Sequence, residues 1–212
     1  MQAVERIINY DYWISIFFVI AFMLLAILKL LKPNGLYGYI VAFFTPGFFH
    51  KQAEKNTSFF SSFQLVLFGF TSLILSLFFF EIAPTYLINK NLKTLSYIFG
   101  ITTVYLLLRF LLDAFMVSVL GLKGFLNYFL YSKFGYLKTL SIWLFPILIF
   151  NQYTFKSSSF LIIIFLILIG FRFLLIIYNN KRLVVNKLFY FILYLCALEI
   201  APLLILYKTT TT

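Results

Sequence analysis

Five charged residues interrupt long apolar stretches and are the residues best able to do chemistry. They are Glu81, Arg109, Asp113, Arg172 and Glu199. Insertion scales assign roughly 2.5 to 3.5 kcal/mol to one charge at the centre of a membrane helix, so five unpaired charges would cost on the order of 10 kcal/mol. We therefore expect them to face one another, water or a partner protein. Such charges either hold helices together or line a path for protons, ions or a substrate.

Two ion pairs are predicted from the positions of these charges along the chain. Arg109 and Asp113 stand at i and i+4 and share one face of a helix. Arg172 and Glu199 lie in two helices joined by a short loop, and their depths differ by less than two turns, which an arginine side chain can cover. As an alternative, a protonated Glu199 donates a neutral hydrogen bond to a carbonyl group.

Three prolines fall in predicted membrane spans. They are Pro84, Pro146 and Pro202, and Pro202 follows Glu199 by one helical turn, where it removes a backbone donor. Discontinuous helices often build ligand sites near the membrane midplane, so these helix-breaking residues favour a transport site. Glu81 lies close to the outer end of its span, where we expect it to reach interfacial water.

The composition indicates an integral membrane protein built from helices. Of the 212 residues, 63% are hydrophobic and 11% are charged, and the mean hydropathy is +1.02. Several stretches approach or exceed the ~20 apolar residues that cross a bilayer as a helix. We therefore predict an all-α fold, a polytopic transmembrane helical bundle that forms one domain over residues 1–212.

The hydropathy pattern predicts about six spans and two short interfacial or re-entrant segments. The spans cover roughly residues 13–31, 59–88, 94–120, 137–153, 158–178 and 188–207. The first short segment covers residues 36–51 and is broken by Pro46 and Gly47, and the second covers residues 124–136. The fourth span is the shortest and contains Pro146, which favours a thinned or tilted helix.

The basic residues predict the orientation. The net charge is +11, and with the amino terminus outside, ten basic residues fall in inner loops and five in outer segments. The positive-inside rule thus predicts both termini on the non-cytoplasmic side. His50 and Lys51 are expected in the inner headgroup layer, where they can contact anionic lipids. Nucleic acid is excluded as a partner because no segment is long and polar enough to form a basic face.

Catalytic and metal-binding motifs are missing from the sequence. One cysteine, Cys196, and one histidine, His50, are too few for a zinc site or for paired haem ligands. The zinc-protease helix, the nucleophile elbow, the Walker loop and the dinucleotide-binding turn are also absent. We therefore expect no metal, no cofactor and no catalytic residues, and we do not expect an enzyme.

Two stretches carry a family resemblance. FILYLCALEIAPLLILYK, Phe191–Lys208, and NTSFFSSFQLVLF, at the start of the second span, resemble domain-of-unknown-function family 4271, a family of small bacterial polytopic membrane proteins. The likeness covers most of the chain in pattern, and its specific part is the last span, where LYLCALEIAP, Leu193–Pro202, belongs to the signature. The resemblance implies a bacterial inner-membrane location and names no chemistry.

Two functions remain open from the sequence. The first is a structural or accessory subunit of a larger inner-membrane or envelope complex, for example secretion or motor machinery, in which the membrane charges fix helices or dock a partner. The second is a small transporter or a proton or ion pathway that uses Glu199 and Arg172. The lipid bilayer and other membrane subunits are the expected partners.

Overall fold

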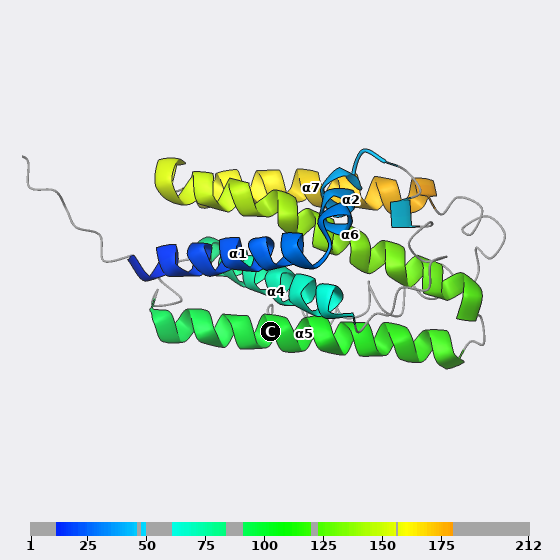
Figure 1. Ribbon diagram of the computed structural model, residues 1–212. Coiled ribbons are helices and arrows are strands. Elements are labelled where there is room, and N and C mark those ends of the chain that lie inside the picture. Colours follow the sequence, from blue (N-terminus) through cyan, green and yellow to red (C-terminus); the bar gives the residue numbers. More distant parts are fainter. Residues whose placement is uncertain are drawn as a thin grey trace, which may run out of the picture. The chain divides into compact units, whose positions relative to one another are not determined.

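The protein is an all-helical bundle in the part of the chain that the structure describes. The computed structural model describes residues 12–45, 48–49, 61–83, 91–119, 123–155 and 157–179, and every regular element within them is a helix (Figure 1). Five of these helices are long and apolar enough to cross a membrane: α1 (Tyr12–Leu31), α4 (Ser62–Ile82), α5 (Leu92–Val119), α6 (Lys123–Phe150) and α7 (Ser158–Asn179). They indicate a membrane protein, as the composition predicts. The sixth predicted span, residues 188–207, lies outside the described residues.

The largest difference from the predicted pattern concerns α6. The predicted short segment 124–136 is not separate from the fourth span, because Lys123–Phe150 is one helix of 28 residues. Lys133 lies in its first half and Lys138 just past its middle, and both lower the local hydropathy, so this part of the sequence resembles an interfacial segment. Pro146 lies inside α6 and does not end it. The helix continues to Phe150 and then widens into a π-helical turn, η1 (Asn151–Phe155).

The first predicted short segment begins as a helix. α2 (Pro33–Val41) has nine residues, with the proline in its first turn, where a missing backbone N–H is tolerated. Nine residues are too few to cross a bilayer, and Figure 1 shows α2 running across the direction of the long helices. Its placement at an interface or as a re-entrant segment stays a prediction.

The chain divides into two compact units, residues 1–172 and residues 173–212. α7 begins in the first unit, and its last turns belong to the second. All packing described below lies within the first unit.

α4 is the central helix of the first unit. In its span 61% of the residues are buried, against 22% in α1 and 17% in α5. It packs against α1, α5 and α6, and Figure 1 shows it between α1 and α5. The hydroxyls of Thr71, Ser72 and Ser76 donate to carbonyls one turn earlier in α4 itself, at 2.7–2.9 Å. The central helix therefore satisfies these polar groups without help from its neighbours.

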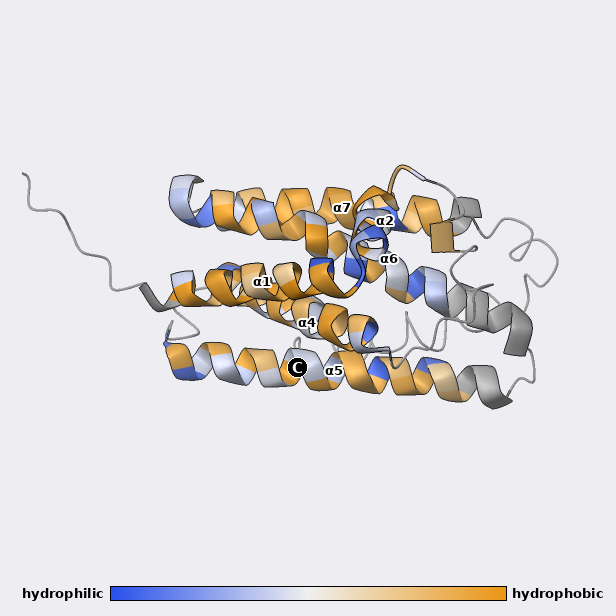
Figure 2. Ribbon diagram, in the orientation of Figure 1, coloured by the Kyte–Doolittle hydropathy of each residue, from blue (hydrophilic) through white to orange (hydrophobic). Residues whose placement is uncertain are grey.

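The outer helices present apolar side chains outward. Figure 2 shows hydrophobic residues along the length of α1, α5 and α7. Large side chains such as Met23, Leu30 and Leu112 are exposed. A soluble protein avoids such surfaces, whereas a lipid-facing helix requires them.

Aromatic packing attaches α2 and the residues after it to the bundle. The ring of the buried Tyr39 lies 5.6–6.0 Å from the rings of Phe48, Phe49 and Phe63. Phe49 also packs on Gly135 of α6, so closely that a Cβ atom at that glycine would collide with the ring. A glycine at this position therefore permits the close approach.

Candidate functional site

A buried ion pair joins α5 to α6. Lys133 Nζ lies 3.1 Å from Asp113 Oδ2, and Nζ also donates to Asp113 Oδ1 at 3.4 Å. The side chains are only 4% and 1% exposed, so both charges are removed from solvent. A charge placed in such surroundings requires a partner of opposite sign, which each residue supplies to the other.

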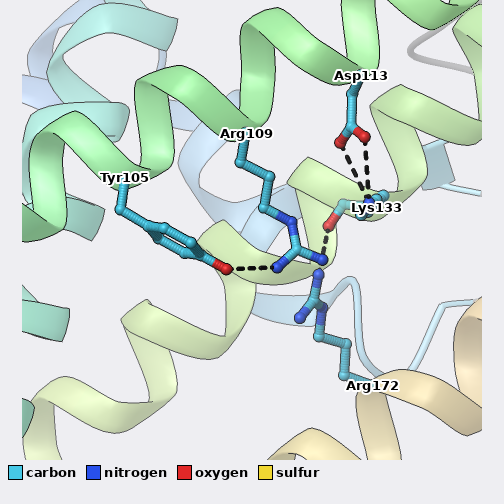
Figure 3. Close-up of polar contacts among 5 residues, drawn as sticks. All are labelled: Tyr105, Arg109, Asp113, Lys133 and Arg172. Atoms are coloured by element: carbon cyan, nitrogen blue, oxygen red, sulfur yellow. Dashed lines mark hydrogen bonds and ion pairs between the residues drawn. The ribbon is translucent and has the colours of Figure 1, made fainter. Parts of the chain in front are cut away.

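Two arginines approach this ion pair from different helices. Arg109, one turn before Asp113 on α5, donates from Nη1 to Tyr105 Oη at 3.0 Å. Arg172 of α7 donates from Nη2 to the backbone carbonyl of Lys133 at 3.2 Å. Figure 3 shows both guanidinium groups directed toward the same region beside Lys133. Three helices thus contribute to one charged cluster, which we call the cationic cluster: Arg109, Lys133 and Arg172.

The cationic cluster lines a cavity of about 140 Å³. All three basic side chains border it, together with the hydroxyl-bearing residues Thr102 and Tyr105. The rest of the lining is apolar and comprises Leu75, Phe79, Leu106, Phe134, Leu137, Leu140, Phe165 and Ile169. Phe79 and Tyr105 are exposed as well as cavity-lining, so the cavity reaches the surface of the bundle.

A second polar cluster lies near the opposite ends of the spans. Glu81, at the end of α4, accepts a hydrogen bond from Asn151 Nδ2 at 3.5 Å. Gln152, with its amide nitrogen turned toward the carboxylate, donates to both oxygens at 3.0 and 3.2 Å. Asn151 is fully buried, and its Oδ1 accepts the backbone N–H of Ser157 at 3.2 Å. The π-helical turn η1 thereby connects the end of α4 to the start of α7.

The separation of the two clusters matches the thickness of a bilayer. Lys133 and Asn151 are eighteen residues apart on α6 and η1, which is about 27 Å of helix rise. The hydrocarbon core of a bilayer is about 30 Å thick. The cationic cluster also lies near the ends of its spans, since Asp113 is near the end of Leu92–Phe115 and Lys133 near the start of Tyr131–Thr154. Each cluster therefore lies near one end of the apolar spans.

A third polar contact fastens α2 and α4 to α6. Lys138 Nζ donates to Gln64 Oε1, and Gln64 Nε2 donates to the hydroxyl of Tyr39 at 2.9 Å. Trp143 of α6 also donates its indole N–H to the carbonyl of Ile40 at 3.1 Å.

The structure brings some of the predicted site residues together and separates others. Arg109, Asp113 and Arg172 lie together, at one end of the bundle, and Glu81 lies at the other. The predicted Arg109–Asp113 pair stays a prediction. The ion pair between Asp113 and Lys133 was not predicted from the sequence. The remaining predicted residues lie outside the described residues: Pro84, Glu199, Pro202, His50 and Lys51. The Arg172–Glu199 pair is therefore also untested.

The missed residue had a usable signal. Position 121 is the middle of the α5–α6 connection, and Asp113 stands eight residues before it and Lys133 twelve after. Counted from this connection, the depths of Asp113 and Lys133 in their helices differ by four residues. That is about one turn, or 6 Å of helix rise, which a lysine side chain can cover. For Asn151 and Gln152 the sequence offered no comparable signal, because amides carry no charge that demands a partner.

Metal ligation finds no support in the described part of the chain. Within it, no three histidine, cysteine, aspartate or glutamate residues gather closely enough to hold a metal ion. The chemistry that the clusters offer is ion pairing, hydrogen bonding and the binding of an anion.

Comparison with known proteins gives one match. The model of a family described as a domain of unknown function, DUF4271, matches residues 14–210. The match confirms the resemblance seen in the sequence. No curated protein and no solved structure matches the chain.

Proposed function

The chain belongs to the DUF4271 family, and on that premise we propose that it is a structural or accessory subunit of a larger bacterial inner-membrane or envelope complex, such as secretion or motor machinery. In this proposal the membrane charges fix the helices in place, and an outer helix docks a partner. The proposed orientation has both termini on the non-cytoplasmic side.

The observation that carries the proposal is the Asp113–Lys133 pair. Its two charges are buried and face each other at 3.1 Å, and they connect two helices that follow one another in the chain. Arg172 adds α7 to the same point through the carbonyl of Lys133. Charges held in this way favour a scaffold with a defined shape, which a partner subunit can recognise.

The outer face of α5 supports a docking role. A shallow groove of about 720 Å³ runs along it and is lined by Ser96, Gly100 and Val104, among other residues of this helix. These three residues are spaced by four and so lie in one row. A Cβ atom added at Gly100 would meet nothing within 4 Å. Ser96 and Gly100 are small, and small residues at this spacing let a second membrane helix approach closely.

Purification of the intact complex tests the proposal. We expect affinity purification of the full chain in a mild detergent to recover a stoichiometric membrane partner. Gly100→Ile should reduce that recovery without lowering the unfolding temperature, because it fills the groove and a Cβ atom at this position meets nothing within 4 Å. Leu112→Ile, at an exposed position of the same helix that does not line the groove, is the matched control. Recovery of this chain alone from native membranes would contradict the proposal.

The occupant of the groove can be identified by crosslinking. With Cys196 replaced by serine, Gly100→Cys carrying a thiol-attached photo-crosslinker should crosslink to a second protein. With Cys196 retained, an intrachain crosslink between the two cysteines would instead assign the groove to the predicted sixth span, residues 188–207, and would remove it as a docking site.

Anion or proton transport is the second candidate function. The observation that favours it is the cavity beside the cationic cluster, since basic groups inside a membrane often mark a substrate path. In reconstituted liposomes, Arg172→Gln and Glu199→Gln should then each reduce an ion- or proton-dependent flux. If the wild-type protein carries no flux for any ion tried, this candidate fails.

A further inference from the structure

We propose that the apolar pocket beside Lys138 receives an aspartate or glutamate side chain from a membrane helix of a partner subunit. The inference rests on the proposed function, which supplies the partner, and it adds the chemistry by which that partner is recognised. Three observations carry it: a lysine charge within a span, the lining of the pocket and an uncovered stretch of α4.

Lys138 places a charge inside an apolar span. It stands seven residues after Tyr131, the first residue of the span Tyr131–Thr154, which is roughly 10 Å of helix rise. Its Nζ donates to Gln64 Oε1, and Gln64 is itself buried. The ammonium group has three donors, and an amide oxygen is a neutral acceptor. A lysine in such surroundings requires an anion as well.

The structure describes two acidic residues, and neither forms an ion pair with Lys138. Asp113 forms its ion pair with Lys133, and Glu81 belongs to the polar cluster near the opposite ends of the spans. In the described part of the chain, the polar contact of Lys138 is its hydrogen bond to Gln64. Within that part, the charge of Lys138 is therefore not neutralised.

The pocket suits an acidic side chain with apolar surroundings. It has a volume of about 230 Å³, and Lys138 and Gln64 are its polar lining. The other lining residues are apolar and come from α4, α5 and α6: Leu65, Phe68, Leu107, Phe110, Leu111 and Phe134. Leu65, Leu107 and Leu111 are also exposed, so the pocket opens on the outer surface of the bundle.

This lining favours a carboxylate on a helix over a free ion. A free ion in the pocket would exchange its water shell for one ammonium group and one amide, and the apolar walls would give it nothing in return. An aspartate or glutamate side chain brings methylene groups that fit the apolar walls, and its carboxylate can pair with Lys138.

The first turns of α4 are uncovered on one side. Leu65 is 54% exposed there, although residues 70–78 of the same helix are all buried. A Cβ atom added at Gly69, one turn after Leu65, would meet nothing within 4 Å. A glycine on an open face lets the backbone of a second membrane helix approach closely. A helix packed over Leu65 and Gly69 would bring its side chains to the mouth of the pocket.

Photo-crosslinking of the full chain in native membranes tests the proposal. Benzoylphenylalanine replaces Leu111 at the rim of the pocket, and the crosslinked peptide is identified by mass spectrometry. We expect a peptide of a partner protein that belongs to an apolar segment and contains an aspartate or a glutamate. The same probe in place of Met23, which is exposed on α1, is the matched control and should not yield that peptide.

Charge variants test the role of Lys138 in forming this crosslink. Lys138→Met should lower its yield about tenfold or more, because the acid of the partner is left without a counter-charge. Lys138→Arg keeps the charge and should retain most of the yield. Lys29→Met removes an exposed charge from α1 and should leave the yield unchanged.

A second variant tests the docking surface without altering the lysine. Gly69→Ile blocks the approach of a helix to α4 and should also lower the yield, because the space at this position is open. The unfolding temperature of each variant in detergent separates a loss of docking from a loss of structure. Gly69→Ile therefore keeps the test decisive even if Lys138→Met does not fold.

Several results would overturn the proposal. Equal yields from the wild type and Lys138→Met would do so and would leave the proposed function intact, as would a partner segment without an acid. Crosslinks to residues 50–60 or 188–207, which contain Glu54 and Glu199, would assign the pocket to the protein itself. Crosslinks to lipid alone would assign it to the bilayer. If the wild type also yields no partner on purification, the proposed function fails and the inference fails with it.

Discussion

Lys133 and Asp113 form an ion pair across two successive membrane helices, with 3.1 Å between Nζ and Oδ2 and almost no exposure of either side chain. Lys133 stands in the stretch whose sequence resembles an interfacial segment. The pair explains why that stretch is instead part of a long helix, because a neutralised lysine can be buried where a lone lysine cannot.

Removal of one partner of this ion pair should be strongly destabilising. We expect Asp113→Asn to lower the free energy of unfolding by about 3–5 kcal/mol, because Lys133 is left as a buried charge without its carboxylate. The unfolding temperature in detergent measures the effect. The double variant Asp113→Asn/Lys133→Met should recover most of the loss. A double variant no more stable than the single one would show that the pair is not the cause.

The close approach at Gly135 gives a second prediction. Gly135→Ala should destabilise the protein by about 1–3 kcal/mol, because the new methyl group collides with the ring of the buried Phe49. Gly69→Ala is the matched control, since a Cβ atom there has open space. That variant should be neutral or gain up to about 1 kcal/mol from better helix propensity. Equal effects of the two substitutions would refute the packing of Phe49 on α6.

The sequence predicts the helices better than it predicts their contacts. Long apolar runs bounded by polar or interfacial aromatic residues place α1 and α7 within one or two residues of their observed bounds. Hydropathy averages over a window, however, and cannot tell a paired lysine from a lone one, so the start of α6 is misplaced. The partner of Asp113 lies in another helix, and a search for pairs at i and i+4 does not reach it. The glycine contact at Gly135 depends on a residue far away in the chain, and no local pattern shows it.

Asn151 should matter more than its uncharged side chain suggests. We expect Asn151→Leu to cost about 1–3 kcal/mol, because it leaves the N–H of Ser157 without its acceptor and removes a donor from Glu81. Unfolding in detergent measures the loss. Tyr153→Phe, which removes an exposed hydrogen bond to Ser15 from the same turn, is the control and should change stability by less than about 1 kcal/mol. If both variants behave alike, Asn151 does not hold the turn.

The Arg172–Glu199 pair predicted from the sequence can be tested by a double-mutant cycle. Arg172→Gln, Glu199→Gln and the double variant are compared by their unfolding free energies. If the residues are paired, the loss of unfolding free energy in the double variant should differ from the sum of the two single losses by about 1 kcal/mol or more. Additive effects would show that Arg172 acts through Lys133 and the cavity, independently of Glu199.

The hydroxyl bonds within α4 bear on the order in which the chain enters the membrane. Thr71, Ser72 and Ser76 are satisfied by their own helix, so these three hydroxyls need no neighbour when α4 enters the lipid, before α5 and α6 emerge. The charge of Lys133, in contrast, is paired with a residue of another helix, Asp113 of α5. Asp113 is made twenty residues earlier, so the acid leaves the ribosome before the lysine. The three hydroxyls of α4 are therefore satisfied as soon as that helix forms, whereas the ion pair can form only once α6 has followed α5.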